Sequence, residues 1–429
     1  MSCFAILCVE IIFHLKFSDF SLKKQQRIPT LIIFFLTLRN ACFYAENVVN
    51  LSKRITMKHI YTEIESRAAL APLIAEGGVV RHCAFQGVVF TPADAVCSFS
   101  DCIFMGCILP EQVRAVMAED CLIFPAIPKT FKVFPSALYS PEQLYEGYRM
   151  GDERSFEECY DTRVYRHYMA YGKQAVDVSE TLARSLHDHA ISDALQDMLA
   201  RYDERRVVAF MGGHALLRTD AGYHAVARMA KHLTEQGLLM LSGGGPGAME
   251  ATHLGAWMAG RTDEELAEAV TVLAVAPKYS DAGWLDSALE VRQRWPQRQG
   301  YCSIGIPTWF YGHEPATPFA THIAKLFENS VREDGLLALA KGGVVYTPGS
   351  AGTMQEIFQD AAQNHYETFG YASPMLFFGV EYWQKTQPVY PLLQHLVATE
   401  RYRNLQLLLT DSEQEIEEAV LRFALQKNA

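Results

Sequence analysis

Two glycine-rich segments carry the residue types that bind a phosphate group. Residues 242–249 read SGGGPGAM, and residues 347–356 read TPGSAGTMQE. Each segment follows a short apolar run and precedes a stretch with helical periodicity. Glycines let the backbone turn sharply and approach a ligand, and the free N–H groups at a helix N-terminus attract an anion. The pair predicts a site for a small phosphorylated molecule, with the Ser350 and Thr353 hydroxyls as further donors.

Both segments lie in a region of alternating strands and helices that begins at Val207. We expect strands at residues 207–211, 238–241, 270–276, 304–307, 343–346 and 374–379. We expect helices at residues 221–236, 248–259, 321–340, 353–364, 389–400 and 412–423. Such alternation implies a parallel sheet with helices on both faces, and ligands of these sheets bind at the carboxyl ends of the strands.

The two segments, in this order, resemble the signatures of the lonely guy family of nucleotide phosphoribohydrolases, which were formerly labelled lysine decarboxylases. Residues 243–249 are similar to a shorter, proline-containing form of the family's GGGxxGxM, and residues 348–356 are similar to its PGGxGTxxE. The resemblance runs from about Arg205 to the C-terminus and includes the Gly212-Gly213 turn and residues 374–393. It implies a Rossmann-like nucleotide-binding domain.

The resemblance also implies an activity, the hydrolysis of a nucleoside 5′-monophosphate to a free base and ribose 5-phosphate. The family's glutamate falls on Glu356, and its upstream arginine falls on Arg332, so these two are the expected catalytic residues. A carboxylate can stabilise the positive charge that develops on the ribose and orient the attacking water, and an arginine can clamp a phosphate. The expected substrate- and phosphate-binding residues are Gly212, Gly213, Gly243, Gly244, Gly245, Gly247, Met249, Gly349, Ser350, Ala351, Gly352 and Thr353.

Two departures from the family pattern keep a second hypothesis open. Ser350 replaces the second glycine of PGG, and Glu333 stands where the family has a lysine after its arginine. The alternative is a non-catalytic nucleotide or cofactor carrier with the same fold. In that hypothesis, Glu356 complements a helix dipole and Arg332 pairs with a neighbouring carboxylate on the surface.

Three further groups are weaker candidates. Asp360 lies four residues after Glu356 and can assist it, although a solvated helix residue is the favoured interpretation. The aromatic segment 309–314, WFYGHE, can stack on a base, although core or subunit contacts explain it equally well. His322 is a polar candidate at the start of the following helix.

The N-terminal half falls outside the resemblance. Residues 1–56 hold two apolar runs separated by a basic stretch, and we hypothesise that translation starts at Met57; a short membrane-associating segment is the alternative. Residues 57–204 are expected to form an accessory domain. Within it, residues 83–109 alternate small and large apolar side chains with a five-residue period, which predicts short stacked strands with inward thiols and aromatics. Residues 141–150, 151–171 and 176–201 are expected to be helices.

Composition limits the partners. The net charge is −11, which argues weakly against a nucleic-acid ligand but leaves a phosphate bound by loop amides possible. The ten cysteines have no zinc-like spacing, so we expect reduced, buried thiols in the cytoplasm and no metal. No cofactor and no stable membrane span are expected, and the nucleotide-binding domain is expected to form a homodimer or a higher homo-oligomer.

Overall fold

The structure, a computed structural model, describes residues 61–312 and 314–426. Residues 1–56 and the hypothesised start at Met57 therefore lie outside the described residues. Contacts between residues group the chain from Glu63 on as one compact unit. Among the described helices, none combines the length and the apolar character that a membrane crossing requires.

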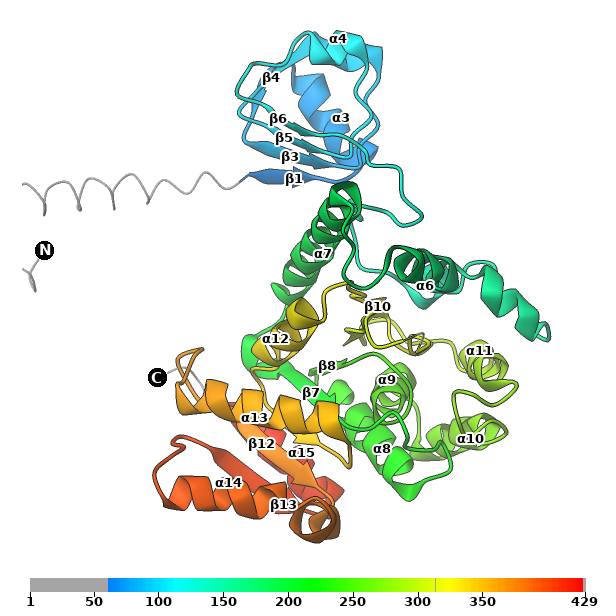
Figure 1. Cartoon of the computed structure of the whole chain (residues 1–429), viewed down its shortest axis with the longest axis vertical. Helices are drawn as coiled ribbons and strands as arrows, with labels where there is room; N and C mark the ends of the chain where they lie inside the picture. The colour runs from blue at the N-terminus through cyan, green and yellow to red at the C-terminus, as the bar shows by residue number, and fades with distance from the viewer. Residues whose placement is uncertain (1–60, 313, 427–429) are drawn as a thin grey trace, which may run out of the picture. The chain divides into compact units, whose positions relative to one another are not determined.

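The first described segment forms a short parallel β-helix (Figure 1). Its strands are β1 (Thr62–Ile64), β2 (Gly78–Arg81), β3 (Cys83–Gln86), β4 (Cys97–Ser100), β5 (Ile103–Met105) and β6 (Leu122–Phe124). Its helices are α3 (Arg67–Glu76), η3 (Pro92–Val96) and α4 (Glu111–Arg114). Strand β2 pairs in parallel with β4, and β3 pairs in parallel with β5, which pairs with β6. Successive turns of the chain therefore stack on one another, as the five-residue period predicts.

The thiols and aromatic rings of this segment point inward. Phe85 and Phe104 are fully buried, and their rings stack with centroids 4.8 Å apart. Burial raises the pKa of Cys102 and Cys107 to about 11, so both thiols stay protonated and act as small apolar side chains. The prediction for residues 83–109 is confirmed. No group of three or more His, Cys, Asp or Glu within the described residues could hold a metal ion.

Helices follow the β-helix, but they are shorter than expected. They are α5 (Pro141–Leu144), η4 (Glu153–Glu158), α6 (Tyr160–Tyr171), α7 (Val178–Leu199) and η5 (Glu204–Arg206). The predictions of continuous helices at 141–150 and 151–171 are wrong. Gly147 has a φ of 103°, which no right-handed helix contains, so the first stretch turns there. The second stretch is interrupted at Cys159, whose ψ of 147° is not helical and separates η4 from α6.

A seven-stranded parallel sheet follows, in the order β10-β9-β8-β7-β11-β12-β13 (Figure 1). The strands are β7 (Val207–Met211), β8 (Leu239–Ser242), β9 (Ser303–Gly305), β10 (His322–Ile323), β11 (Val344–Tyr346), β12 (Pro374–Phe378) and β13 (Gln406–Thr410). The chain moves outward from β7 to β10 and then returns to β11 beside β7. This reversal lies between β7 and β11, and ligands of such sheets bind at the carboxyl ends of the strands at a reversal of this kind.

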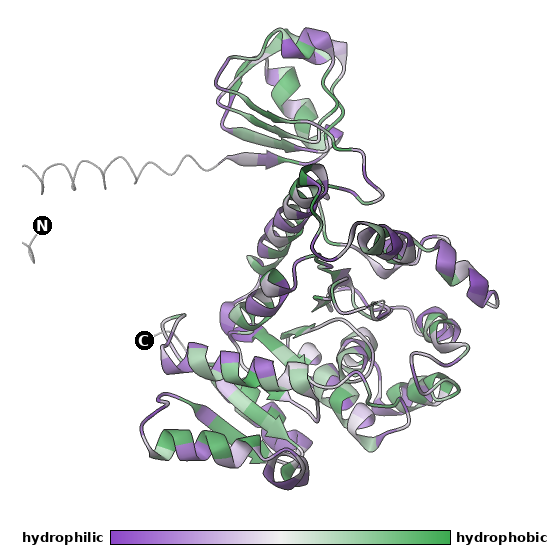
Figure 2. Ribbon diagram, viewed as in Figure 1, coloured by the Kyte–Doolittle hydropathy of each residue, from purple (hydrophilic) through white to green (hydrophobic). Residues whose placement is uncertain are grey.

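Helices cover both faces of the sheet, because alternate side chains of each strand point to opposite faces. The helices are α8 (Ala221–Glu235), α9 (Ala248–Met258), α10 (Asp263–Leu273), α11 (Trp284–Arg294), α12 (Asn329–Leu339), α13 (Ala351–His365), η6 (Tyr382–Thr386), α14 (Val389–Ala398) and α15 (Glu413–Ala424). Val208 and Phe210 of β7 pack with α8 and α9, whereas Ala209 and Met211 belong to the core on the other face. Figure 2 shows the strands as mostly hydrophobic and the helices as mixed. The expected Rossmann-like fold class is confirmed.

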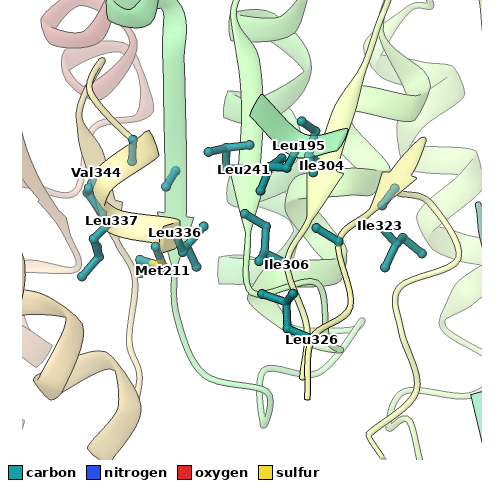
Figure 3. Close-up of a cluster of buried hydrophobic side chains, with 14 of the residues drawn as sticks. Leu195, Met211, Leu241, Ile304, Ile306, Ile323, Leu326, Leu336, Leu337 and Val344 are labelled. Carbon is teal, nitrogen blue, oxygen red and sulfur yellow. The ribbon is translucent and has the colours of Figure 1, made fainter. Parts of the chain in front are cut away.

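The helix α7 contributes to the same core as the strands. Leu195 of α7 lies among Leu241, Ile304 and other side chains of the sheet (Figure 3). The expected domain boundary at 204/205 falls between α7 and β7, and the buried core continues across it.

Two expectations for the sheet region are wrong. Residues 270–276 are not a strand, because Thr262 and Glu265 form a capping box that starts helix α10, whose buried Leu266, Val270 and Leu273 follow a helical period. Residues 321–340 are not one helix: β10 comes first, and α12 begins only at Asn329. The sequence analysis also missed α11 and β13.

The β-helix core yields a stability prediction. Phe104→Ala should lower the free energy of unfolding by about 3–5 kcal/mol, because it leaves a cavity against Phe85 and the neighbouring rings. Phe124→Ala, at a 40% exposed position on β6, is the matched control and should cost much less. Urea unfolding followed by circular dichroism measures both, and equal losses would contradict the inward orientation of Phe104.

Candidate functional site

The loops after β7, β8 and β11 meet at the carboxyl ends of these strands. The loop after β7 begins with Gly212-Gly213, the loop after β8 is residues 243–247, and the loop after β11 is residues 347–350. Strands β8, β7 and β11 are consecutive neighbours in the sheet, so the three loops lie side by side. Most of the residues expected to bind phosphate belong to these loops and to the first turns of α9 and α13.

The backbone of Gly213 joins the two glycine-rich segments. Its N–H donates to the Pro348 carbonyl at 3.0 Å, and its carbonyl accepts from the Ala248 N–H at 3.2 Å. A Cβ on the preceding Gly212 would overlap the Thr347 hydroxyl and lie 2.8 Å from the Ala248 Cβ. Only glycine therefore allows β7 to bring the N-termini of α9 and α13 this close together.

Packing requires glycine at two positions of the first loop, Gly244 and Gly247, and is close at Gly243 and Gly245. The Met249 side chain folds back over the loop, so a Cβ on Gly243 would lie 2.8 Å from its Sδ, and a Cβ on Gly245 would lie 2.9 Å from its Cε. Gly247 has a φ of 71°, and a Cβ there would lie 2.5 Å from the Gly213 carbonyl oxygen. Gly244 similarly abuts the segment after β9, with Pro307 Cδ 2.8 Å from an added Cβ. The loop is buried, and Met249 supports it rather than facing open space.

A buried histidine that the sequence analysis missed holds this loop. His253 Nε2 lies 2.8 Å from Ser242 Oγ, which accepts a hydrogen bond from the Gly244 N–H at 3.0 Å. Its Nδ1 lies 2.8 Å from Ser303 Oγ on β9. Burial lowers the pKa of His253 to about 3, so the ring is neutral. It connects Ser242 to Ser303 by hydrogen bonds. Nothing in the local sequence distinguishes His253, because its partners lie on two other elements.

The second loop is the one that faces outward. Ser350, Ala351 and Gly352 are exposed, and a Cβ on Gly352 would meet no other atom within 4 Å. The Ser350 side chain makes no capping hydrogen bond to α13, so within the described chain the helix N-terminus is left uncapped. Thr353 is instead buried, and its hydroxyl lies against Gly349 beneath the loop. The exposed donors are therefore the Ser350 hydroxyl and the backbone amides at the start of α13.

Glu356 and Arg332 meet beside this helix N-terminus. Arg332 Nη1 lies 3.6 Å from Glu356 Oε1, and the side chains are 14% and 13% exposed. Arg332 Nη2 would lie 3.9 Å from a Cβ on Gly243, so the guanidinium also approaches the first loop. Helix α13 begins at Ala351, which puts Glu356 in the second turn, beyond the strongest part of the helix dipole. The structure thus brings the two expected catalytic residues together next to both loops.

The environment of Glu356 changes its acidity. Burial, opposed by Arg332 and reinforced by Glu333, raises the pKa of Glu356 to about 7. At neutral pH the side chain is therefore divided between its acid and carboxylate forms. A general base with a pKa near the operating pH is well suited to proton transfer.

Helix α12 is held in place by α7. Asp188 of α7 accepts hydrogen bonds from the Phe327 N–H at 3.0 Å and the Glu328 N–H at 2.8 Å, immediately before α12 begins. The carboxylate thus binds the free amides that precede this helix and fixes its start. Because α12 carries Arg332, the position of the arginine depends on a residue that precedes the sheet in the chain.

Glu333, Tyr311 and Gln355 surround the arginine. Glu333 Oε1 lies 4.0 Å from Arg332 Nη1 and accepts from the Tyr311 hydroxyl at 3.4 Å. Glu333 Oε2 accepts from Gln355 Nε2. The Tyr311 side chain remains 59% exposed, so it is an aromatic surface near the arginine.

The weaker candidates have structural partners. Asp360 is buried and accepts from the Tyr346 hydroxyl at 2.8 Å, so its interpretation as a solvated residue is wrong. Burial raises the pKa of Asp360 to about 7 as well. Trp309 is fully buried, and its Nε1 donates to Asp161 at 2.8 Å, so it belongs to the core. His322 lies on β10 with its Nδ1 2.9 Å from Thr321 Oγ1, away from the three loops.

No protein-family model and no curated protein matches the chain. Among solved structures, the chain is similar to the molybdenum cofactor binding protein from the phototrophic bacterium Rippkaea orientalis, with 13% identity and a TM-score of 0.32, covering 50% of this chain and 95% of that chain. It is also similar to the molybdenum cofactor carrier protein MCP from Chlamydomonas reinhardtii, with 13% identity and a TM-score of 0.31, covering 51% of this chain and 99% of that chain.

The raised pKa of Glu356 predicts a pH-dependent stability. Its pKa of about 7 lies above its ordinary 4.5, so its contribution to folding is full below about pH 4.5 and is lost as the pH rises through 7. Glu356→Gln does not ionise, so its melting temperature should exceed that of the parent at pH 8, and the difference should shrink toward pH 5. Calorimetric scans across this range measure the effect. Glu381→Gln, which removes an 82% exposed carboxylate, is the control and should show no such trend. A Glu356→Gln variant that is less stable than the parent at pH 8 would contradict the raised pKa of Glu356.

Proposed function

We propose that the chain binds a nucleoside 5′-monophosphate at the three loops and hydrolyses its N-glycosidic bond. The observation that carries this proposal is the pairing of Glu356 with Arg332 beside the exposed N-terminus of α13. The products are a free base and ribose 5-phosphate. The cytoplasmic location and the homo-oligomeric assembly expected from the sequence stay predictions.

The start of α13 supports the phosphate-binding part of the proposal. The first N–H groups of a helix lack partners within the helix, and the helix dipole adds positive potential there. Ser350, Ala351 and Gly352 present this end to solvent, and Gly352 leaves room for an anion to approach the backbone. The protein has a net charge of −11. Backbone amides of this kind can still bind a phosphate, because they need no net positive charge on the protein.

The carboxylate supports the hydrolytic part. Cleavage of an N-glycosidic bond passes through an oxocarbenium-like transition state with positive charge on the ribose. Ionised Glu356 would stabilise that charge and accept a proton from the attacking water. It lies in the second turn of α13, three to five residues after the amides that would hold the phosphate.

Arg332 has hydrogen-bonding capacity left for a ligand. Its Nη1 faces Glu356 and Glu333, whereas its buried Nε has no hydrogen-bond partner within the described residues. A guanidinium carries five N–H donors, so a substrate oxygen can bind on the side that faces Gly243. This arrangement would orient the ribose over Glu356.

A nucleotide or cofactor carrier is the second candidate function. The observation that favours it is Glu333, a second carboxylate 4.0 Å from Arg332 Nη1. Glu333 neutralises part of the positive charge that Arg332 would offer to a substrate. The exposed Ser350 in place of a glycine adds a side chain at the mouth of the second loop. A carrier needs the phosphate site but not a catalytic carboxylate.

Glu356→Gln separates the two functions. The phosphate would be held by backbone amides that the substitution leaves in place, so the affinity for the nucleotide should stay within a few-fold of the parent. The carboxylate acts mainly on charge present in the transition state, so kcat should fall by about a hundred- to a thousandfold. Base release from AMP, CMP, GMP and UMP, measured by chromatography, and calorimetric binding of the best substrate test both parts.

Asp360→Asn is the matched control, since it removes another buried acid one turn further along the same helix. This variant should retain turnover if it folds. Full activity in Glu356→Gln would eliminate Glu356 as the catalyst. Tight nucleotide binding by the parent without any base release would favour the carrier.

A further inference from the structure

Two consecutive charged residues of helix α12, Arg332 and Glu333, lie beside α13. Arg332 lies between the carboxylates of Glu356 and Glu333, at 3.6 and 4.0 Å from its Nη1. One guanidinium is thus shared by two carboxylates, and the cluster carries an excess of one negative charge when both acids are ionised. A lysine at 333, as in the family that the sequence resembles, would reverse the sign of that excess.

Glu333 is held too firmly to move away. It is 8% exposed, and its two oxygens accept hydrogen bonds from Tyr311 and from Gln355, the neighbour of Glu356 on α13. The Tyr311 hydroxyl in turn accepts from Asn329 Nδ2 at 3.1 Å. These contacts fix the Glu333 carboxylate beside the arginine and tie α12 to the start of α13.

We propose that Glu333 is a positioning residue that shares Arg332 with Glu356 and so raises the pH at which Glu356 becomes a carboxylate. Like charges that are close together oppose each other's ionisation, and a shared counter-ion neutralises each of them less than it would neutralise one alone. The inference rests on the proposed function for its catalytic consequence, but the ionisation of Glu356 is a property of the free protein.

The other groups near Glu356 do not replace this role. Arg332 favours its ionisation from α12, and Glu333 opposes it from the same helix. Tyr346 on β11 stays protonated, because burial raises the pKa of its hydroxyl well above the ordinary value, and it donates to Asp360. Asp360 on α13 is bound by Tyr346 and Asn364. Glu333 is therefore the charged neighbour whose removal changes Glu356 most without removing its counter-ion.

The test is a carbon-13 NMR titration of the Glu356 carboxyl in the full chain, with Glu356→Gln used to assign its signal. In Glu333→Gln, the titration midpoint should move to lower pH by about one unit, the effect of removing one nearby like charge. Glu333→Lys should move it further in the same direction. Asp334→Asn is the matched control, because this exposed neighbour on α12 bonds to Gln359 instead of Arg332, and its midpoint should stay close to that of the parent.

The rising limb of kcat/KM against pH should move with the NMR midpoint in each variant. An unchanged midpoint in both folded Glu333 variants, or an equal shift in Asp334→Asn, would overturn the proposal. If no nucleotide is hydrolysed by the parent but the midpoint moves as stated, the positioning role stands and the proposed hydrolysis fails. If Glu333→Gln unfolds, Glu333→Lys serves in its place, and an unchanged Glu356 midpoint in that folded variant would overturn the proposal.

Discussion

The two hydrogen bonds of the Gly213 backbone hold the candidate site together. One binds the loop after β11, and the other binds the first residue of α9. Their geometry requires that β7 end without a side chain at Gly212, where Thr347 and Ala248 occupy the space of a Cβ. Two helix N-termini then lie side by side at the point where the strand order reverses. Parallel sheets of this kind bind their ligands at such a point.

The chemistry of the site depends on residues far from the loops. Asp188 of α7 binds the amides that precede α12, and α12 carries Arg332 and Glu333 to the side of α13. A second buried carboxylate, Asp161 of α6, holds Lys325 at 2.8 Å in the segment that leads into α12. Buried charges of this kind are costly unless they are paired, so moving these helices apart would be strongly destabilising. The helices before the sheet thus position the arginine although they lie outside the glycine-rich motifs.

Local patterns predicted the parts of the fold that local interactions determine. Strand β7 was predicted with its observed bounds, and the inward thiols of the β-helix followed from their five-residue period. The family resemblance, and no local pattern, pointed to Glu356 and Arg332, which the structure places 3.6 Å apart. The apolar run at 270–276 was misread as a strand because its helical signal, the capping box at Thr262, lies eight residues upstream.

The remaining misses concern contacts between elements. The sequence suggests that Asp360 is a solvated helix residue, whereas in the structure it is buried and accepts a hydrogen bond from Tyr346 of β11. His253 carries no motif, yet it connects Ser242 to Ser303 across two strands. The glycines of the first loop suggested close approach of a ligand, whereas Gly244 and Gly247 are required by contacts with Pro307 and with the Gly213 backbone. These contacts join elements that are far apart in the chain, so no spacing in the sequence indicates them.

The central claim is that the start of α13 holds a phosphate with the sugar turned toward Glu356. A crystal structure of the full chain with ribose 5-phosphate tests it directly. We expect phosphate oxygens within hydrogen-bonding distance of the backbone amides of Ala351, Gly352 or Thr353, with the sugar C1 facing the Glu356 carboxyl. A phosphate bound elsewhere, or a sugar whose C1 points away from Glu356 and Arg332, would contradict it.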